Sequence, residues 1–181
     1  MGQIQNAFNA GVGSIIASKG IAEHLQSQAF DKIERQMAEG MKLADDAKSI
    51  TDQMNENNKK SVDIEKSFNE IEKKSNIEHP RDEKSGRFVN KKEYQRKLER
   101  DADEAYQALA DLQIQQEATA AQAQAFNDRM EMYHKRSNLV QNAINRLPAK
   151  KRPELPNLDK IIPQEQLRNI QALKETEKEN K

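Results

Sequence analysis

The sequence predicts an all-α, elongated protein, in which two long helices form an antiparallel helical hairpin or coiled coil. A Pro-rich linker and a short C-terminal helix are expected to follow. The prediction depends on apolar positions that recur every seven residues in both halves of the chain, and on one clear interruption between the halves. Because 35% of the 181 residues are hydrophobic and 33% are charged, the chain can fill a thin contact between helices but not a thick core.

The most regular periodicity belongs to the second half, where it predicts a long helix over residues 92–147. Its apolar positions from Leu98 to Leu147 extend over about 75 Å of helix. We call its apolar positions the seam. Steps of four and three residues define the seam as Leu98, Ala102, Ala105, Leu109, Leu112, Gln116, Thr119, Ala123, Phe126, Met130, Tyr133, Ser137, Val140, Ile144 and Leu147. The centre of the seam is small or polar, and such a contact specifies register and oligomeric state only weakly.

A comparable pattern predicts the first long helix over residues 21–77. Its apolar or small positions include Phe30, Ile33, Met37, Gly40, Ala44, Ala47, Ile50, Met54, Ile64, Phe68 and Ile71. Two steps of three fall together at Ala47 and Ile50, which is a stammer and overwinds a coiled coil locally. The polar stretch over residues 55–61 is expected to be a weak or strained point of this helix.

A loop is predicted at residues 78–91, because Pro80 cannot continue a helix and Ser85-Gly86 is a turn signal. The equal lengths of the two flanking helices favour an antiparallel hairpin within one chain, whereas a parallel bundle of several copies is the competing arrangement. The loop region is basic and contains Phe88, so it could contact anions such as DNA phosphates. The candidate residues for this contact are Arg81, Lys84, Arg87, Lys91 and Lys92.

The N-terminal segment, residues 1–20, is rich in glycine and alanine, and residues 1–18 contain no ionisable side chain. It is too polar for a confident transmembrane span, and it lacks the pattern of a secretory signal or a myristoylation site. Two interpretations remain open: conditional membrane insertion through residues 1–25, or a small helix folded back on the rod or packed in an oligomer. The membrane-interaction candidates are Ile4, Phe8, Val12, Ile15 and Ile16.

The composition changes after Leu147. Four of the five prolines lie between residues 148 and 163, which predicts an extended linker without regular hydrogen bonding. Residues 164–181 are expected to form a short helix and a charged tail. The apolar stripe of this helix, formed by Leu167, Ile170 and Leu173, is too short to be stable in water unless it docks.

Catalytic and metal-binding motifs do not emerge from the sequence. There is no cysteine, and the three histidines are far apart with no carboxylates at metal-ligand spacing around them. The glycines do not form a phosphate-binding loop. We therefore expect no enzymatic activity, no metal site and no cofactor.

The uncharged N-terminus, the long Ala/Gln-rich coiled coil (residues 113–126 at its centre) and the proline-punctuated charged tail occur together in this chain. This layout resembles small phage minor virion proteins, namely the DNA pilot proteins of microviruses and the internal ejection proteins of podoviruses. The resemblance concerns layout alone and transfers no functional residues.

The resemblance implies a structural protein located in the virion, or in the host envelope during delivery, that self-assembles into a homo-oligomer and assists the passage of DNA. Other virion proteins, DNA and membrane would be its further partners. Two alternatives are a non-viral coiled-coil adaptor or spacer, which would be cytoplasmic, and a phage capsid scaffolding protein.

Overall fold

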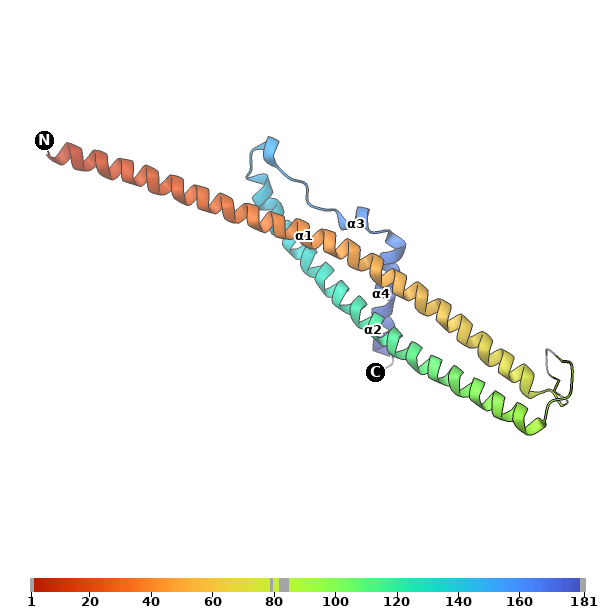
Figure 1. Ribbon diagram of the computed structural model, residues 1–181. Coiled ribbons are helices and arrows are strands. Elements are labelled where there is room, and N and C mark those ends of the chain that lie inside the picture. Colours follow the sequence, from red (N-terminus) through yellow and green to blue (C-terminus); the bar gives the residue numbers. More distant parts are fainter. Residues whose placement is uncertain (1, 79, 82–84, 180–181) are drawn as a thin grey trace. The chain divides into compact units, whose positions relative to one another are not determined.

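The computed structural model describes residues 2–78, 80–81 and 85–179, and the side chains of residues 27–78, 80–81 and 85–173. The elements are α1 (Gly2–Ser75), α2 (Lys91–Asn145), the 3-10 helix η1 (Ala149–Lys151), α3 (Leu158–Ile161) and α4 (Gln164–Glu179), in this order (Figure 1). Among the described residues there is no strand, and α1 and α2 pack against each other. The predicted all-α fold class, a helical hairpin with a short C-terminal helix, is confirmed.

The chain divides into two compact units, which are described separately. Unit 1 contains residues 1–46 and 126–164, and unit 2 contains residues 47–125 and 165–181. The division in α1 falls between Asp46 and Ala47, at the stammer of the apolar pattern. Both units are antiparallel, since in each of them the partners on α2 run backwards as those on α1 run forwards.

The core of unit 1 joins both long helices and the linker. A cluster of buried residues contains Ile33 from α1 and Val140, Ile144 and Leu147 from α2 and the residues just after it. Phe30, Met37 and the linker residue Leu155 pack against this cluster. Because each element covers apolar side chains of another, the cluster stabilises the pairing of the helices and the path of the linker together.

The contact in unit 2 is thinner and partly polar. Ala105, Leu112 and Ala123 are buried on α2, where most of the neighbouring residues are exposed. Asn57, which is 7% exposed, donates a hydrogen bond to Thr119 Oγ1 at 3.1 Å. A buried polar pair of this kind favours one register, which compensates for the few bulky residues available here.

Several predicted boundaries differ from the structure. The helix that was expected at residue 21 begins at Gly2, so residues 2–20 continue α1 and do not fold back on it. This stretch contains no proline, and isolated glycines weaken a helix without ending it. The polar residues 55–61, which were expected to be a weak or strained point rather than a boundary, lie within α1, and Asn57 has a partner on α2. The first long helix ends at Ser75 rather than residue 77, and the second covers Lys91–Asn145 rather than 92–147.

The linker was predicted to be extended throughout, and this was wrong for two short stretches. Residues 149–151 form η1, and residues 158–161 form α3. The first of these turns is held by Arg152, which donates to the backbone oxygens of Leu147 at 2.9 Å and Asn145 at 3.0 Å. Hydrogen bonds from the Arg152 side chain therefore satisfy backbone carbonyl groups in a segment where prolines lack the N–H group needed for regular backbone hydrogen bonding.

Candidate interaction surfaces

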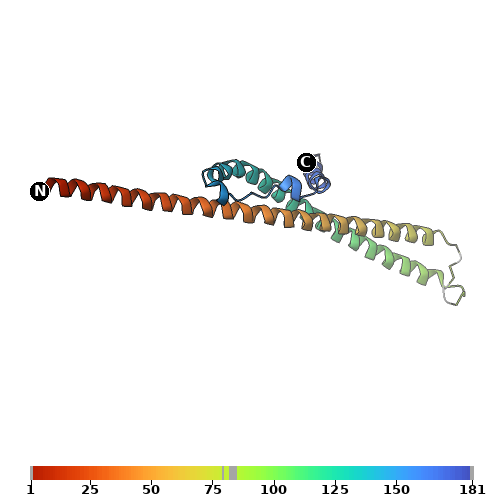
Figure 2. The same cartoon turned by 90° about the horizontal axis from the view of Figure 1, so that it is seen from above.

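The first surface is the N-terminal arm, which we define as residues 2–26 of α1. Figures 1 and 2 both show this part of α1 continuing past the end of α2. A helix of this length is about 37 Å long. The side chains of the membrane-interaction candidates Ile4, Phe8, Val12, Ile15 and Ile16 lie outside the described residues. In the described part of the chain, no helix combines the length and the apolar character needed to cross a membrane.

The second surface is the basic loop between α1 and α2. Its ends pair with each other, because Val89 N–H donates to the carbonyl of Pro80 at 3.0 Å and the guanidinium of Arg81 lies 4.5 Å from the centre of the Phe88 ring. Gly86 turns the chain with a φ of 65°, which favours glycine. Stacking on a ring leaves the N–H groups of an arginine available to an anion.

Of the predicted anion-contact residues, four are exposed in the structure and one lies outside the described residues. Lys84 is the latter. The other four come from the loop and from the first turn of α2, and they are Arg81, Arg87, Lys91 and Lys92. The start of α2 carries the partial positive charge of a helix N-terminus, and Asn90 Oδ1 already accepts a hydrogen bond there from the N–H of Lys92 at 2.9 Å.

The predicted seam residues of α2 lie on the side that faces α1. Four seam positions are half-buried, namely Leu98, Ala102, Leu109 and Ser137. The one exposed seam position is Gln116, at the polar centre of the pattern. The other positions are buried, and they are Ala105, Leu112, Thr119, Ala123, Phe126, Met130, Tyr133, Val140, Ile144 and Leu147. Because α1 of the same chain covers the seam, a second copy would need another surface.

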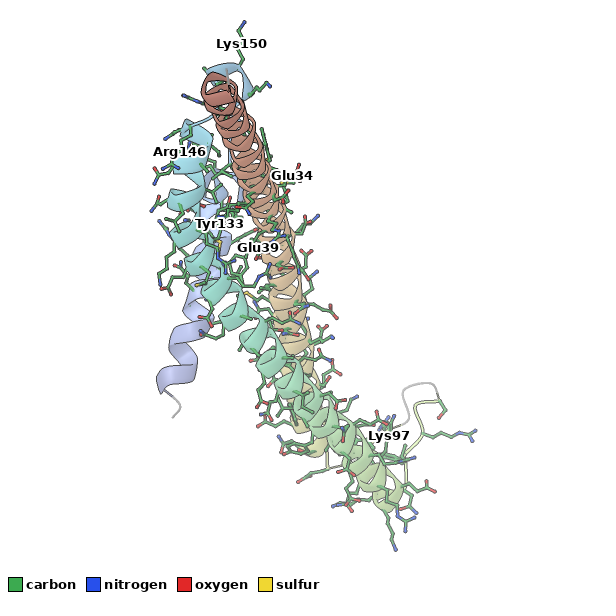
Figure 3. The ribbon with its side chains drawn as sticks, turned by 90° about the vertical axis from the view of Figure 1, so that its left-hand side faces the viewer. Glu34, Glu39, Lys97, Tyr133, Arg146 and Lys150 are labelled. Atoms are coloured by element: carbon green, nitrogen blue, oxygen red, sulfur yellow. The ribbon has the colours of Figure 1, made fainter. Side chains whose placement is uncertain are left out.

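A polar network around Tyr133 connects α1, α2 and the linker in unit 1. Gln36 Nε2 donates to the backbone oxygen of Tyr133 at 2.9 Å and to Ser137 Oγ at 2.9 Å. The Tyr133 hydroxyl donates to the backbone oxygen of Pro156 at 2.8 Å. Figure 3 shows Tyr133 where α2 runs beside α1, whereas Lys150 points away into solvent. The buried polar groups of this network are thus satisfied by partners from three segments.

Burial raises the pKa of the Tyr133 phenol. A raised pKa in the folded state means that this proton contributes stability below pH about 10, where the unfolded chain begins to ionise. The contribution is then lost as the pH rises through the pKa of the folded protein. We expect the unfolding free energy to fall more steeply between pH about 9 and 11 in the wild type than in Tyr133→Phe. Urea titrations followed by circular dichroism measure this difference, and parallel pH profiles would contradict it.

Arg129 forms the main charged contact between α1 and α2 in unit 1. Its guanidinium binds Glu39, with Nε and Nη2 at 2.9 and 2.8 Å from Oε1, and also binds Asp46. Partial burial opposes the charge on Arg129, but the hydrogen bonds and charges of Asp46 and Glu39 raise its pKa overall. The sequence pattern did not single out Arg129 or Gln36, because neither occupies an apolar position of the heptad.

The third surface is a groove between α1 and α2 in unit 1, with a volume of about 870 Å³. Its walls combine apolar residues such as Leu139, Val140 and Ala143 with charged ones. Leu139 is 71% exposed, the largest value among the large hydrophobic residues whose side chains the structure describes. The cationic residues of the lining are Lys32, Arg35, Lys42, Arg136 and Arg146. Figure 3 places Arg146 near the end of α2.

Within the described residues, no group of three or more histidine, cysteine, aspartate or glutamate side chains is arranged to hold a metal ion. The structure presents three candidate surfaces: an arm whose residues 2–18 carry no ionisable side chain, a basic loop and a cationic groove. Comparison with protein-family models, curated proteins and solved structures finds no match for this chain.

Proposed function

We propose that the protein is a minor structural component of a phage virion, which self-associates and assists the delivery of DNA across the host envelope. The observation that carries the proposal is the N-terminal arm: α1 continues through an uncharged stretch and extends past the end of α2. The first 17 residues of α1, residues 2–18, contain no charged side chain, so transferring this part of the helix out of water costs less free energy than transferring a typical surface helix.

The hairpin supports the same proposal in a different way. Because α1 and α2 of the same chain pack against each other and cover the seam, the arm extends from a helix pair whose apolar contact is already formed within one chain. In this proposal the hairpin acts as a support, and the arm contacts the envelope. The exposed basic residues of the loop, Arg81, Arg87, Lys91 and Lys92, would contact the phosphates of the DNA.

Membrane engagement by the arm is tested with vesicles of mixed neutral and anionic lipids. We expect the full-length protein to float with the vesicles and to release an entrapped dye, and deletion of residues 2–20 to abolish both effects. Ile15→Asp should also abolish them, because it places a charge in the apolar part of the arm. Asn9→Asp adds the same charge at a position that is already polar, and serves as the matched control.

Two results would contradict the proposal. Full-length protein that neither floats nor releases dye at any salt concentration would favour the adaptor or spacer alternative. Equal activity of the wild type and of the variant that lacks residues 2–20 would show that the arm does not act on the membrane.

A further inference from the structure

We propose that the groove of unit 1 binds an acidic face of α2 from a second copy of this chain. The inference rests on the self-association included in the proposed function, and identifies the surfaces that would carry it. The seam cannot serve this purpose, because α1 of the same chain already covers it. The contact would therefore involve surfaces that are exposed in the hairpin.

The groove has the composition of a site for an acidic, partly apolar helix. Five cationic side chains line it, against one carboxylate, that of Glu39, which is already bound by Arg129. All five are exposed and form no ion pair within the part of the chain that the structure describes. Apolar side chains lie among them, and Leu139 is the most exposed. Nucleic acid would match the charge but not the apolar residues.

The complementary surface lies on unit 2 and is defined as the acidic face. Tyr106 and Ile114 are 63% and 65% exposed, and Ala110 lies between them at a spacing of four residues. With Leu139, they are the most exposed large hydrophobic residues of α2. Three exposed carboxylates share this side of the helix by helical periodicity, and they are Glu99, Asp103 and Glu117.

The dimensions of the two surfaces also agree. The groove follows α1 from Lys32 to Lys42, and it follows α2 from Arg136 to the end of the helix and Arg146 just after it, which is about 15 Å along each side. The apolar residues of the acidic face extend over about 12 Å, and its carboxylates continue beyond them. Tyr106 is already held in place, because its ring packs edge-on against Phe68 with 5.1 Å between ring centres. The arrangement is that of a helix docking in a groove between two helices, with apolar anchors and charged flanks.

A groove and a face that differ from each other form a heterologous contact. Each copy offers one of each, so the contact can continue from copy to copy and produce a chain or a ring of subunits. If the groove is blocked in one copy and the acidic face in another, the two copies retain one intact groove and one intact face between them, and only these two surfaces can bind each other.

The test uses full-length protein and sedimentation velocity over a range of concentrations. The groove variant carries Arg136→Glu and Arg146→Glu, and the face variant carries Asp103→Lys and Glu117→Lys. We expect the wild type to form species larger than a dimer, and each variant alone to associate at least about tenfold more weakly. A 1:1 mixture of the variants should form a dimer and nothing larger. Association of the wild type should weaken as salt rises from about 0.05 to 0.5 M, since the charges are exposed.

Matched controls carry the same change in charge elsewhere on exposed positions. Lys48→Glu with Lys73→Glu matches the groove variant, and Asp52→Lys with Glu65→Lys matches the face variant. Both controls should associate like the wild type. Circular dichroism must give wild-type helicity for every variant, and a variant that is not folded is replaced by Leu139→Asp or Ile114→Lys.

Three outcomes would overturn the inference. Oligomers of the groove or face variant equal to those of the wild type would show that copies associate through other surfaces, and the proposed function would survive. A 1:1 mixture that remains monomeric would show that groove and face do not bind each other. Wild-type protein that stays monomeric at all concentrations would refute this contact and the proposed self-association together, whereas the vesicle assay would still test the arm.

Discussion

Replacing Ile144 by alanine should lower the free energy of unfolding by about 2–5 kcal/mol. Ile144 is 1% exposed and belongs to the cluster that joins α1, α2 and the linker. Its truncation removes buried apolar surface and leaves a cavity that three segments would have to close together. Collapse is difficult because Ile33 on α1 and Leu147 after α2 are already packed against their other neighbours.

The measurement is urea unfolding followed by circular dichroism, with Leu139→Ala as the control. Leu139 lies on the same helix but is 71% exposed, so its truncation should change the unfolding free energy by no more than about 0.5 kcal/mol. Equal effects of the two variants would mean that the cluster does not stabilise unit 1.

The fold class and the seam follow from simple periodicity. Heptad spacing shows which side of a long helix is apolar, and Pro80 with Gly86 shows where two helices must separate. Among the predicted seam positions, Ile144 and Leu112 are examples that the structure buries. The heptad pattern identifies the apolar side of each helix, so it predicts the buried residues correctly where that side is covered by another long helix.

Periodicity does not indicate which residues of a helix a non-helical segment will cover. On α1 the pattern selected Met37 and Ala44, which are half-buried, but the structure also buries Gln36 and Leu43, the latter completely. A buried stripe of this width is typical of a helix on which more than one element packs. In unit 1 the linker is the additional element, and its proline-rich composition does not indicate where it would lie.

Gly40 is the clearest example of a residue whose structural role depends on the position of the linker. In the sequence it is one small residue in an apolar series. In the structure a Cβ at this position would lie 2.8 Å from the Tyr133 hydroxyl oxygen, and 3.1 Å from both Cβ and Cγ of Pro156. Glycine therefore permits the close approach of the linker, and the Tyr133–Pro156 hydrogen bond closes over it.

Gly40→Ala should therefore destabilise the protein, against the usual trend. In an exposed helix, glycine to alanine raises stability by about 1 kcal/mol. At Gly40 the added methyl group must displace the tyrosine hydroxyl or the proline ring, and overpacking of this kind costs about 1–3 kcal/mol. Ser49→Ala, at an exposed position of α1, is the comparison and should raise stability slightly, because alanine is the better helix former. Thermal and urea unfolding measure both variants, and an increase in stability for Gly40→Ala would refute the close approach.

A double-mutant cycle with Tyr133→Phe identifies the group that is responsible. Removing the hydroxyl eliminates the shortest of the three contacts while leaving Pro156 in place. The cost of Gly40→Ala should then shrink by about 1 kcal/mol in the Tyr133→Phe background, while the part that comes from the proline ring persists. If the two changes are additive, the ring of Pro156 limits the space at Gly40 and the hydroxyl does not. A coupling of the expected sign would show that one hydrogen bond to the linker and one missing side chain on α1 act as a single structural feature.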